Sequence, residues 1–180
     1  MSQSLNKAVK ALKSGGIIAF PTETVYGIGA LLKDKKAIAK IFAIKRRPNT
    51  KPLQVLVASL EQAKKLGNFN KQALKLAANG WPGPLTLVVK KKRTVPQIVT
   101  GGRSTVGLRV PDHKLALELI KLCGPIVATS ANEAGEKPAL TAQEVKRKVP
   151  EVDLILSGKI KTGTPSQVID ATGRTKVLRA

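Results

Sequence analysis

The sequence predicts one α/β domain over residues 1–180, in which helices flank a strongly twisted sheet of mixed parallel and antiparallel strands. The chain is 42% hydrophobic, which is enough apolar material for one buried core. Short apolar runs typical of strands are interspersed irregularly with segments of helical spacing. Since strict alternation of strands and helices would favour a parallel sheet, this irregular order favours a mixed one.

The individual elements follow from apolar spacing and from Gly, Pro and capping residues. In chain order we expect a helix over 5–13, strand 16–20, helix 35–44, strand 53–57, a helix opening at 59, helix 71–78, strands 85–89 and 106–110, helix 113–122, strand 125–129, helix 142–148, and strands 152–156, 167–169 and 177–179. Ser14–Gly16 ends the first helix, and Ser59 caps the third. Prolines within residues 79–84 prevent the fourth helix from continuing.

The chain carries a formal net charge of +21, which is distributed unevenly. Residues 1–110 hold 21 Lys and Arg against three acids, giving +18, whereas residues 111–180 hold 11 against 8, giving +3. The densest basic cluster is Lys90–Arg93. Such a surface attracts anionic metabolites and polyanions, including RNA. Aromatic residues do not alternate with the basic ones, so the pattern of a base-stacking platform is missing from the sequence.

Several function classes are disfavoured by the sequence. Apolar runs are too short for a membrane-spanning helix, and the polar N-terminus lacks the core of a signal peptide. One cysteine, Cys123, allows no internal disulfide, and together these features favour a cytoplasmic protein. The single histidine, His113, has no second His or Cys at ligand spacing, so we expect no protein-bound metal and no Ser-His-Asp triad.

The polar segment Pro21–Gly27 directly follows the strand expected at 16–20. It therefore lies at the carboxyl end of a strand, where open α/β sheets place their ligands. It carries hydroxyls, a phenol and a carboxylate, and Gly27 suits a tight backbone turn. Taken alone, the segment is equally well explained as a polar turn that satisfies its own backbone.

Lys45 and Arg47 close the helix expected at 35–44. Pro48 disfavours a helical conformation for Arg47, so the side chains of Arg47 and Lys45 leave the helix in different directions and can converge on one anion. Basic residues in a last helical turn more often complement the helix dipole. Both interpretations stay open from these residues alone.

Polar residues also flank two later strands. Ser130 and Asn132 follow the strand at 125–129, again at a carboxyl end, whereas Ser166 precedes the strand at 167–169. A polar turn or a helix cap explains either group taken singly.

Six short motifs occur one after another along the chain. They are Pro21–Gly27, Lys45-x-Arg47-Pro48 with Lys51–Leu53, Trp81–Pro84, Val106–His113, Thr129–Asn132 with Gly135, and Pro165-Ser166-x-Val168-Ile169-Asp170. In this order they resemble the YrdC-like threonylcarbamoyl-AMP synthases, from about residue 5 to Arg179. The length is similar to that of the short, single-domain members, and the resemblance implies a YrdC-like fold with a basic central cavity.

The resemblance implies that L-threonine, bicarbonate and ATP are combined into threonylcarbamoyl-AMP, with release of pyrophosphate. Downstream proteins would transfer the threonylcarbamoyl group to N6 of an adenosine in tRNA, and the basic surface makes tRNA itself a candidate partner. Because the amine of threonine attacks bicarbonate, no enzyme nucleophile is required. The site needs Lys and Arg to hold anions, with Mg²⁺ carried by the phosphates.

The resemblance also assigns roles to individual residues. The catalytic residues would be Lys45, Arg47, Ser130 and Asn132. The nucleotide would be bound by Lys45, Arg47, Lys51, Thr105, Asn132 and Arg179. Threonine would be bound by Thr24, Tyr26, Arg109, Ser130 and Ser166. The sequence departs from the family at Leu56, where longer relatives carry His, and at Gln167, where Thr is common.

Two other functions stay open. One is a non-catalytic RNA-binding or ribosome-associated protein of the same fold, whose binding would depend steeply on salt and not on threonine. The other is a relative that makes a carbamoyl-adenylate for a different acceptor, as in hydrogenase-maturation proteins that contain this fold. Those proteins carry zinc-finger and acylphosphatase domains that are missing from these 180 residues.

Overall fold

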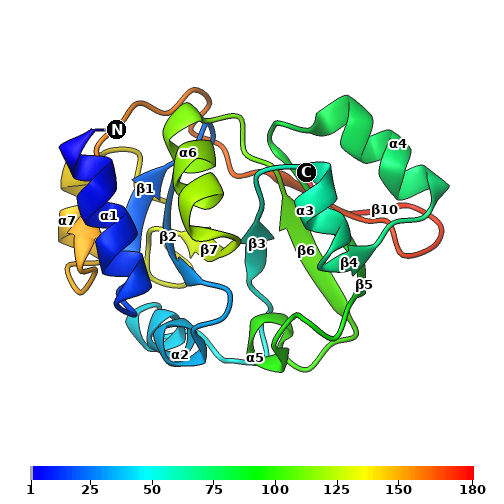
Figure 1. Cartoon of the computed structure of the whole chain (residues 1–180), viewed down its shortest axis with the longest axis horizontal. Helices are drawn as coiled ribbons and strands as arrows, with labels where there is room; N and C mark the ends of the chain where they lie inside the picture. Colours follow the sequence, from blue (N-terminus) through cyan, green and yellow to red (C-terminus); the bar gives the residue numbers. More distant parts are fainter. Residues whose placement is uncertain (1) are drawn as a thin grey trace.

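The computed structural model describes residues 2–180, which form a ten-stranded sheet packed against helices (Figure 1). The strands are β1 (Ile18–Pro21), β2 (Tyr26–Leu31), β3 (Gln54–Leu56), β4 (Gly67–Asn68), β5 (Leu85–Lys91), β6 (Thr105–Arg109), β7 (Ile126–Ser130), β8 (Leu154–Ile155), β9 (Gln167–Asp170) and β10 (Lys176–Arg179). The helices are α1 (Gln3–Lys13), α2 (Lys35–Ile44), α3 (Leu60–Lys64), α4 (Lys71–Gly80), α5 (Gln97–Thr100), α6 (Lys114–Cys123) and α7 (Ala142–Lys148).

The strand order across the sheet is β10-β9-β5-β6-β3-β7-β2-β1-β8, and β4 pairs with β5 beside this path. The pairs β1–β8, β3–β6 and β5–β9 are parallel, and the other pairs are antiparallel. The sheet is therefore mixed, and the predicted fold class is confirmed.

Two apolar clusters lie on opposite faces of the sheet. Alternation along β1 shows the division, because Ala19 belongs to the cluster with α2, α4 and α7, whereas Ile18 and Phe20 belong to the cluster with α1 and α6. The strand residues buried in the second cluster come from β1, β3 and β7 but, within residues 2–180, not from β5, β6 or β9. Helices α1 and α6 thus cover only one half of their face.

The half of the sheet beyond α1 and α6 carries polar residues on that face. Along β6, Val106 and Leu108 point into the α4-side cluster, whereas Thr105, Gly107 and Arg109 line a cavity on the opposite face. The fold therefore provides an open, partly polar sheet surface beside a helix-covered one.

The predicted elements occur near their expected positions, and α2 and α7 have the expected bounds. Ser59 caps α3 as expected, since its Oγ accepts a hydrogen bond from Gln62 N at 3.2 Å. The short elements β4 and α5 had not been predicted. The sequence pattern does not predict the strand β2 either, because Tyr26 and Gly27 belong to the polar segment Pro21–Gly27.

Gly27 corrects one expectation about that loop. It does not have a positive φ, and it pairs with Ser130 of β7 inside the sheet. A Cβ at Gly27 would lie 3.3 Å from the carbonyl oxygen of Thr129. The glycine therefore permits close strand contact rather than a tight turn.

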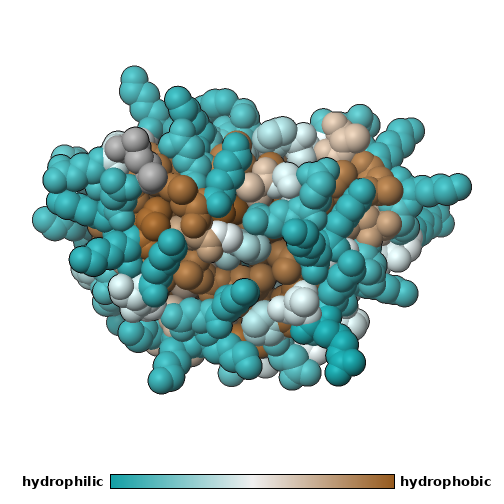
Figure 2. Space-filling model, viewed as in Figure 1, coloured by the Kyte–Doolittle hydropathy of each residue, from teal (hydrophilic) through white to brown (hydrophobic). Residues whose placement is uncertain are grey.

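Most of the molecular face shown in Figure 2 is covered by hydrophilic side chains, with apolar residues visible around its centre and in a second group toward the upper right. This agrees with a chain whose formal net charge is +21. None of the helices within residues 2–180 combines the length and the apolar character needed to cross a bilayer.

Candidate active site

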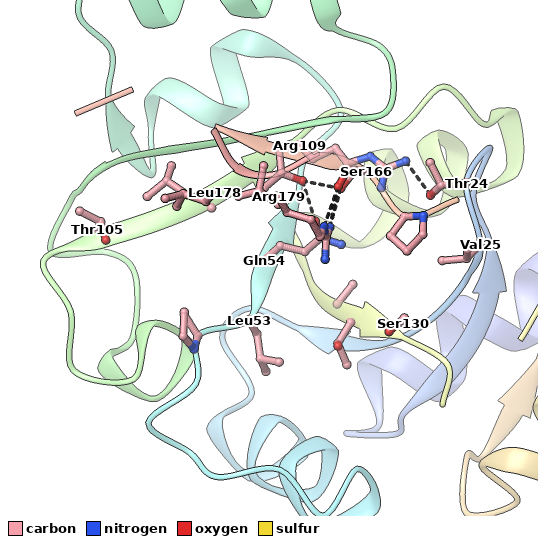
Figure 3. A pocket seen from close by; sticks show the side chains of 18 of the residues that line it. Thr24, Val25, Leu53, Gln54, Thr105, Arg109, Ser130, Ser166, Leu178 and Arg179 are labelled. Carbon is pink, nitrogen blue, oxygen red and sulfur yellow. Dashed lines mark hydrogen bonds between the residues drawn. The ribbon is translucent and has the colours of Figure 1, made fainter. Parts of the chain in front are cut away.

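A cavity of about 280 Å³ opens on the polar half of the sheet (Figure 3). Seven of the predicted site residues line it: Thr24, Arg47, Thr105, Arg109, Ser130, Ser166 and Arg179. They come from the loop after β1, the end of α2, and strands β6, β7 and β10 with the segment before β9. Residues that are distant in the sequence therefore meet around one space.

The charge around the cavity is strongly positive. Arg47, Arg103, Arg109 and Arg179 line it, and the lining residues include no Asp or Glu. Burial lowers the pKa of Arg47, and burial together with the charge of Arg109 lowers the pKa of Arg179. Guanidinium groups held close together in a partly buried space favour anionic ligands such as phosphates and carboxylates.

Arg109 is anchored deep in the cavity by neighbouring groups. Its Nε donates to the carbonyl oxygen of Gly83 at 3.1 Å, and its Nη2 donates to Thr24 Oγ1 at 3.0 Å (Figure 3). Nη2 also lies 2.7 Å from Glu23 Oε1, and both side chains of this ion pair are 3% exposed. These contacts fix the orientation of the guanidinium of Arg109, which lines the cavity.

A left-handed turn separates Lys45 from Arg47. Arg46 has a φ of 46°, while its N–H donates to Ala43 O and the N–H of Arg47 donates to Phe42 O, each at 3.0 Å. These bonds form a Schellman ending for α2 with arginine at the position that glycine usually takes. The Arg47 side chain lines the cavity, where its Nη2 donates to the carbonyl oxygen of Pro52 at 3.0 Å.

Lys45 points elsewhere. Its Nζ donates to the carbonyl oxygens of Ser130 at 2.7 Å and of Asn132 at 2.5 Å, and the residue is 1% exposed. Burial, followed by the charge of Arg47, lowers the pKa of Lys45 to about 8. Of the two cations that could converge on one space, only Arg47 lines the cavity. Lys45 instead ties α2 to the segment that carries Ser130 and Asn132.

Asn132 is buried beside the cavity without lining it. Its Nδ2 donates to the carbonyl oxygens of Glu133 and Glu136, at 2.6 and 3.0 Å. Its Oδ1 has no hydrogen-bond partner within residues 2–180. A buried acceptor without a donor is unfavourable in a native protein and is commonly explained by a ligand, water or ion.

Ser166 and Arg179 form one wall of the cavity (Figure 3). Arg179 donates from Nε and Nη2 to the carbonyl oxygen of Ser166 and from Nη2 to its Oγ, at 2.9, 2.7 and 3.2 Å. Ser166 Oγ also lies 2.9 Å from Thr86 Oγ1, which donates to Gln54 Oε1 at the same distance. These hydrogen bonds from Arg179 hold the strand β10 against the cavity wall.

Tyr26, which the resemblance places at the threonine site, makes its side-chain hydrogen bonds away from the cavity. It is not among the residues that line the cavity, because its hydroxyl donates to Gly158 O at 2.8 Å and accepts from Gly158 N at 2.9 Å. Tyr26 thus fixes the segment before β9 rather than facing the space. Lys51 is exposed and likewise does not line the cavity.

Four polar lining residues are not among the predicted site residues: Gln54, Thr86, Arg103 and Thr129, the last of which belongs to the motif Thr129–Asn132. Gln54 and Thr86 lie within strands. Their side chains reach the cavity because they are on the part of the sheet that the helices do not cover, which the sequence does not reveal. Arg103 follows the turn Gly101–Gly102, in which both glycines have positive φ. A Cβ at Gly101 would lie 2.3 Å from Thr50 O, so this turn requires glycine there. In the sequence, the glycine pair just before β6 is the feature that indicates this turn and the position of Arg103 after it.

The two departures from the family pattern also have structural positions. Leu56 is 1% exposed in the cluster with α1 and α6, and it does not line the cavity. Gln167 is exposed, whereas its neighbours Ser166 and Val168 line the cavity. Gln167 therefore faces away from the cavity, as strand alternation requires.

Acidic, histidine and cysteine side chains are not grouped around the site. Within residues 2–180, three or more such residues do not come together in a way that would hold a metal ion. The side chains that surround the cavity therefore suit anions and not a protein-held cation.

The chain is similar to known proteins over most of its length. Residues 10–180 match the Sua5/YciO/YrdC family, which is described as telomere recombination. A threonylcarbamoyl-AMP synthase of Pyrococcus abyssi is 42% identical over 171 residues, which make up 93% of this chain and 50% of the relative. A threonylcarbamoyl-AMP synthase of Cellvibrio japonicus is 37% identical over 177 residues, covering 94% of this chain and 92% of the relative.

A solved structure supports the assignment. The P. abyssi Sua5 complexed with L-threonine has a TM-score of 0.93 and 40% identity to this protein, covering 97% of this chain and 53% of that chain. This chain thus spans about half the length of the P. abyssi protein and nearly all of the C. japonicus one. With a family match over almost the whole sequence, the chain belongs to the Sua5/YciO/YrdC family, and the resemblance drawn from the six motifs is confirmed.

Proposed function

We propose that this protein is a threonylcarbamoyl-AMP synthase, which condenses L-threonine, bicarbonate and ATP into threonylcarbamoyl-AMP and pyrophosphate. The observation that carries the proposal is the meeting of seven predicted site residues around one arginine-lined cavity. The names of the relatives and the threonine complex of P. abyssi Sua5 support the same activity.

The chemistry requires only binding, orientation and charge compensation from the protein. The amine of threonine attacks the carbon of bicarbonate and water leaves, which gives a carbamate. An oxygen of the carbamate then attacks the α-phosphorus of ATP, and pyrophosphate departs with the electron pair of the broken P–O bond. Because negative charge accumulates on the phosphates in this step, fixed cations around them lower the barrier.

The residues divide between the two substrates as follows. Arg109 would bind the carboxylate of threonine, with Thr24 and Ser166 beside it. Arg47 would bind the phosphates from the opposite side, and Ser130 lies where the two substrates would meet. Thr105 and Arg179 also line the cavity and would contact the nucleotide.

Lys45 and Asn132 would act at the edge of this arrangement. Lys45 holds the carbonyl oxygens of Ser130 and Asn132, so it would order the catalytic segment and add positive charge near the phosphates. Asn132 Oδ1, which has no partner within residues 2–180, would accept a hydrogen bond from a substrate. Lys51 would reach the nucleotide from the rim. A role of Tyr26 in direct threonine contact is not part of the proposal.

Mg²⁺ is expected to enter with the phosphates of ATP. The cavity offers no carboxylate to hold the ion, so its residues do not fit a metal bound by the protein itself. The protein would work in the cytoplasm, pass its product to threonylcarbamoyl-transfer proteins, and use its basic surface to approach tRNA. The non-catalytic RNA-binding alternative is not favoured, because the curated relatives named above are synthases.

Pyrophosphate release from ATP tests the proposal. With Mg²⁺ and bicarbonate present, L-threonine should stimulate release strongly, whereas L-serine and no amino acid should give little. Pyrophosphate release that is the same with and without threonine would contradict the proposed function. So would an absence of release combined with salt-sensitive RNA binding.

A further inference from the structure

Glu23 is a buried carboxylate in the loop between β1 and β2. The resemblance to the family gives this residue no role. It neighbours the lining residue Thr24, but it is 2% exposed and does not itself line the cavity. Its single ion-pair partner within residues 2–180 is Arg109, at 2.7 Å. A carboxylate buried this deeply is retained only when a nearby cation compensates it.

The contact between Glu23 and Arg109 has an unusual geometry. Both carboxylate oxygens of Glu23 are without a hydrogen-bond donor in the described part of the chain, although Oε1 is close to Nη2. The carboxylate therefore compensates the charge of the guanidinium without taking a well-aligned N–H. The N–H groups that Arg109 does use lie on Nε and Nη2, toward Gly83 and Thr24. Nη1 of Arg109 makes no hydrogen bond to another group within residues 2–180.

The backbone of Glu23 is held by the segment that leads to Ser166. Its carbonyl oxygen accepts hydrogen bonds from the N–H groups of Lys161 and Thr162, each at 2.9 Å. The N–H of Gly163 donates to the carbonyl oxygen of Thr24 at the same distance. The loop and the segment that leads to Ser166 thus form one unit behind Arg109.

A purely structural ion pair would be expected to satisfy its own hydrogen bonds. Buried ion pairs are weak contributors to stability, and a carboxylate without aligned donors gains even less from burial. Glu23 also lies beside a cavity lined by four arginines, where burial and then the charge of Arg109 lower the pKa of Arg179. Placing one negative charge directly behind Arg109 reduces the repulsion between these two arginines and fixes the guanidinium.

We propose that Glu23 is a positioning residue for amino-acid binding: it holds Arg109 so that Nη1 is available to the carboxylate of threonine. This inference rests on the proposed function. It assigns the selectivity for an amino acid to the Glu23–Arg109 pair and not to Arg109 alone. Glu23 makes no contact with the reacting atoms in this account.

The test compares Glu23→Gln, which keeps the shape and removes the charge, with the wild-type protein. The KM for threonine should rise about tenfold or more, as expected for losing the alignment of one charge-assisted hydrogen bond. The KM for ATP should not change, because Arg47 and Arg179 lie on other walls. Asp112→Asn is the matched control, since it removes the exposed ion pair with Lys161 and should leave both constants unchanged.

A second comparison separates positioning from general loss of structure. In an Arg109→Gln background, Glu23→Gln should raise the threonine KM no further, because the group that it positions is gone. If Glu23→Gln does not fold, Glu23→Asp takes its place, since it keeps the charge but withdraws it from Arg109 by one methylene. The same selective rise in threonine KM is expected.

An unchanged threonine KM, or an equal rise for threonine and ATP, would overturn the inference while leaving the proposed function intact. Failure of both Glu23 variants to fold would show a structural role and would also overturn it. If the wild-type protein itself shows no threonine-dependent pyrophosphate release, the proposed function fails and this inference fails with it.

Discussion

Arg46 and Arg47 are neighbours in the chain but lie in opposite environments. The Arg46 side chain is 80% exposed and lies 3.7 Å from a carboxylate oxygen of Glu133, whereas Arg47 lines the cavity. The left-handed conformation of Arg46 produces this separation. Such a conformation is unfavourable for a non-glycine residue, so the surrounding structure must hold it in place.

This pair of arginines gives a matched mutational test. Arg47→Ala should lower kcat/KM for ATP by about 100-fold or more, because it removes a charge-assisted contact to the phosphates. Its circular dichroism spectrum should stay that of the wild-type protein. Arg46→Ala, which removes the same charge one residue earlier, should leave kcat/KM nearly unchanged. Unfolding of Arg47→Ala would instead indicate a structural role for this residue.

Lys45 gives the site a pH dependence. Since its pKa is lowered to about 8 by burial and by Arg47, the ammonium loses its proton as the pH rises through about 8. Because the site then loses a positive charge near the phosphates, kcat/KM for ATP should decline above this pH when it is measured from pH 7 to 9.5. Lys45→Arg stays charged throughout this range and should lack the decline. The same decline in both proteins would assign it to another group.

At the residue scale, the sequence identified side chains that stand at strand ends within recognisable motifs. Arg109, Ser130 and Ser166 belong to this class. Gln54 and Thr86 could not be found in this way, because strand alternation gives the two faces but does not show which face the helices leave open. The contact between Tyr26 and Gly158 could not be predicted for a similar reason, because Gly158 is distant in the sequence.

At the element scale, residues 157–166 form a crossing segment that has no helix or strand of its own. It is held to the β1–β2 loop by backbone hydrogen bonds from Lys161, Thr162 and Gly163, and to β2 by the hydroxyl of Tyr26. The crossing segment ends at Ser166 on the cavity wall. The position of this serine therefore depends on contacts made elsewhere along the segment.

Tyr26→Phe tests the role of the crossing segment. Loss of the hydroxyl leaves the N–H and C=O of Gly158 without their partner, which should reduce the free energy of unfolding by about 1–3 kcal/mol in urea titrations. The KM for threonine should rise only slightly. Unchanged stability together with a large rise in threonine KM would show that the hydroxyl faces the substrate after all.

The helices were easier to predict than the strands. Apolar spacing and caps are local signals, and they placed α2 and α7 correctly. The strand β2 contains Gly27 and Gly29, which have low strand propensity. Its pairing with β1 and β7 supplies the stabilisation. Such pairing is non-local, so a single sequence does not reveal it.

At the scale of the whole molecule, the site results from incomplete coverage of a mixed sheet. One face is packed against α2, α4 and α7, whereas α1 and α6 cover only part of the other. Strands β5, β6 and β9 expose alternate residues on the uncovered part, and the loop after β1 and strand β10 close it from two sides. The fold class followed from the order of elements, but the location of this uncovered half required the three-dimensional structure.

Product identification is the most direct measurement of the central claim. Purified protein is incubated with ATP, Mg²⁺, L-threonine and ¹³C-bicarbonate, and the adenylates are analysed by mass spectrometry. The account predicts a labile threonylcarbamoyl-AMP that contains one ¹³C atom and is lost in the Arg47→Ala variant. An adenylate without the label, or no adenylate beside unchanged ATP, would contradict it.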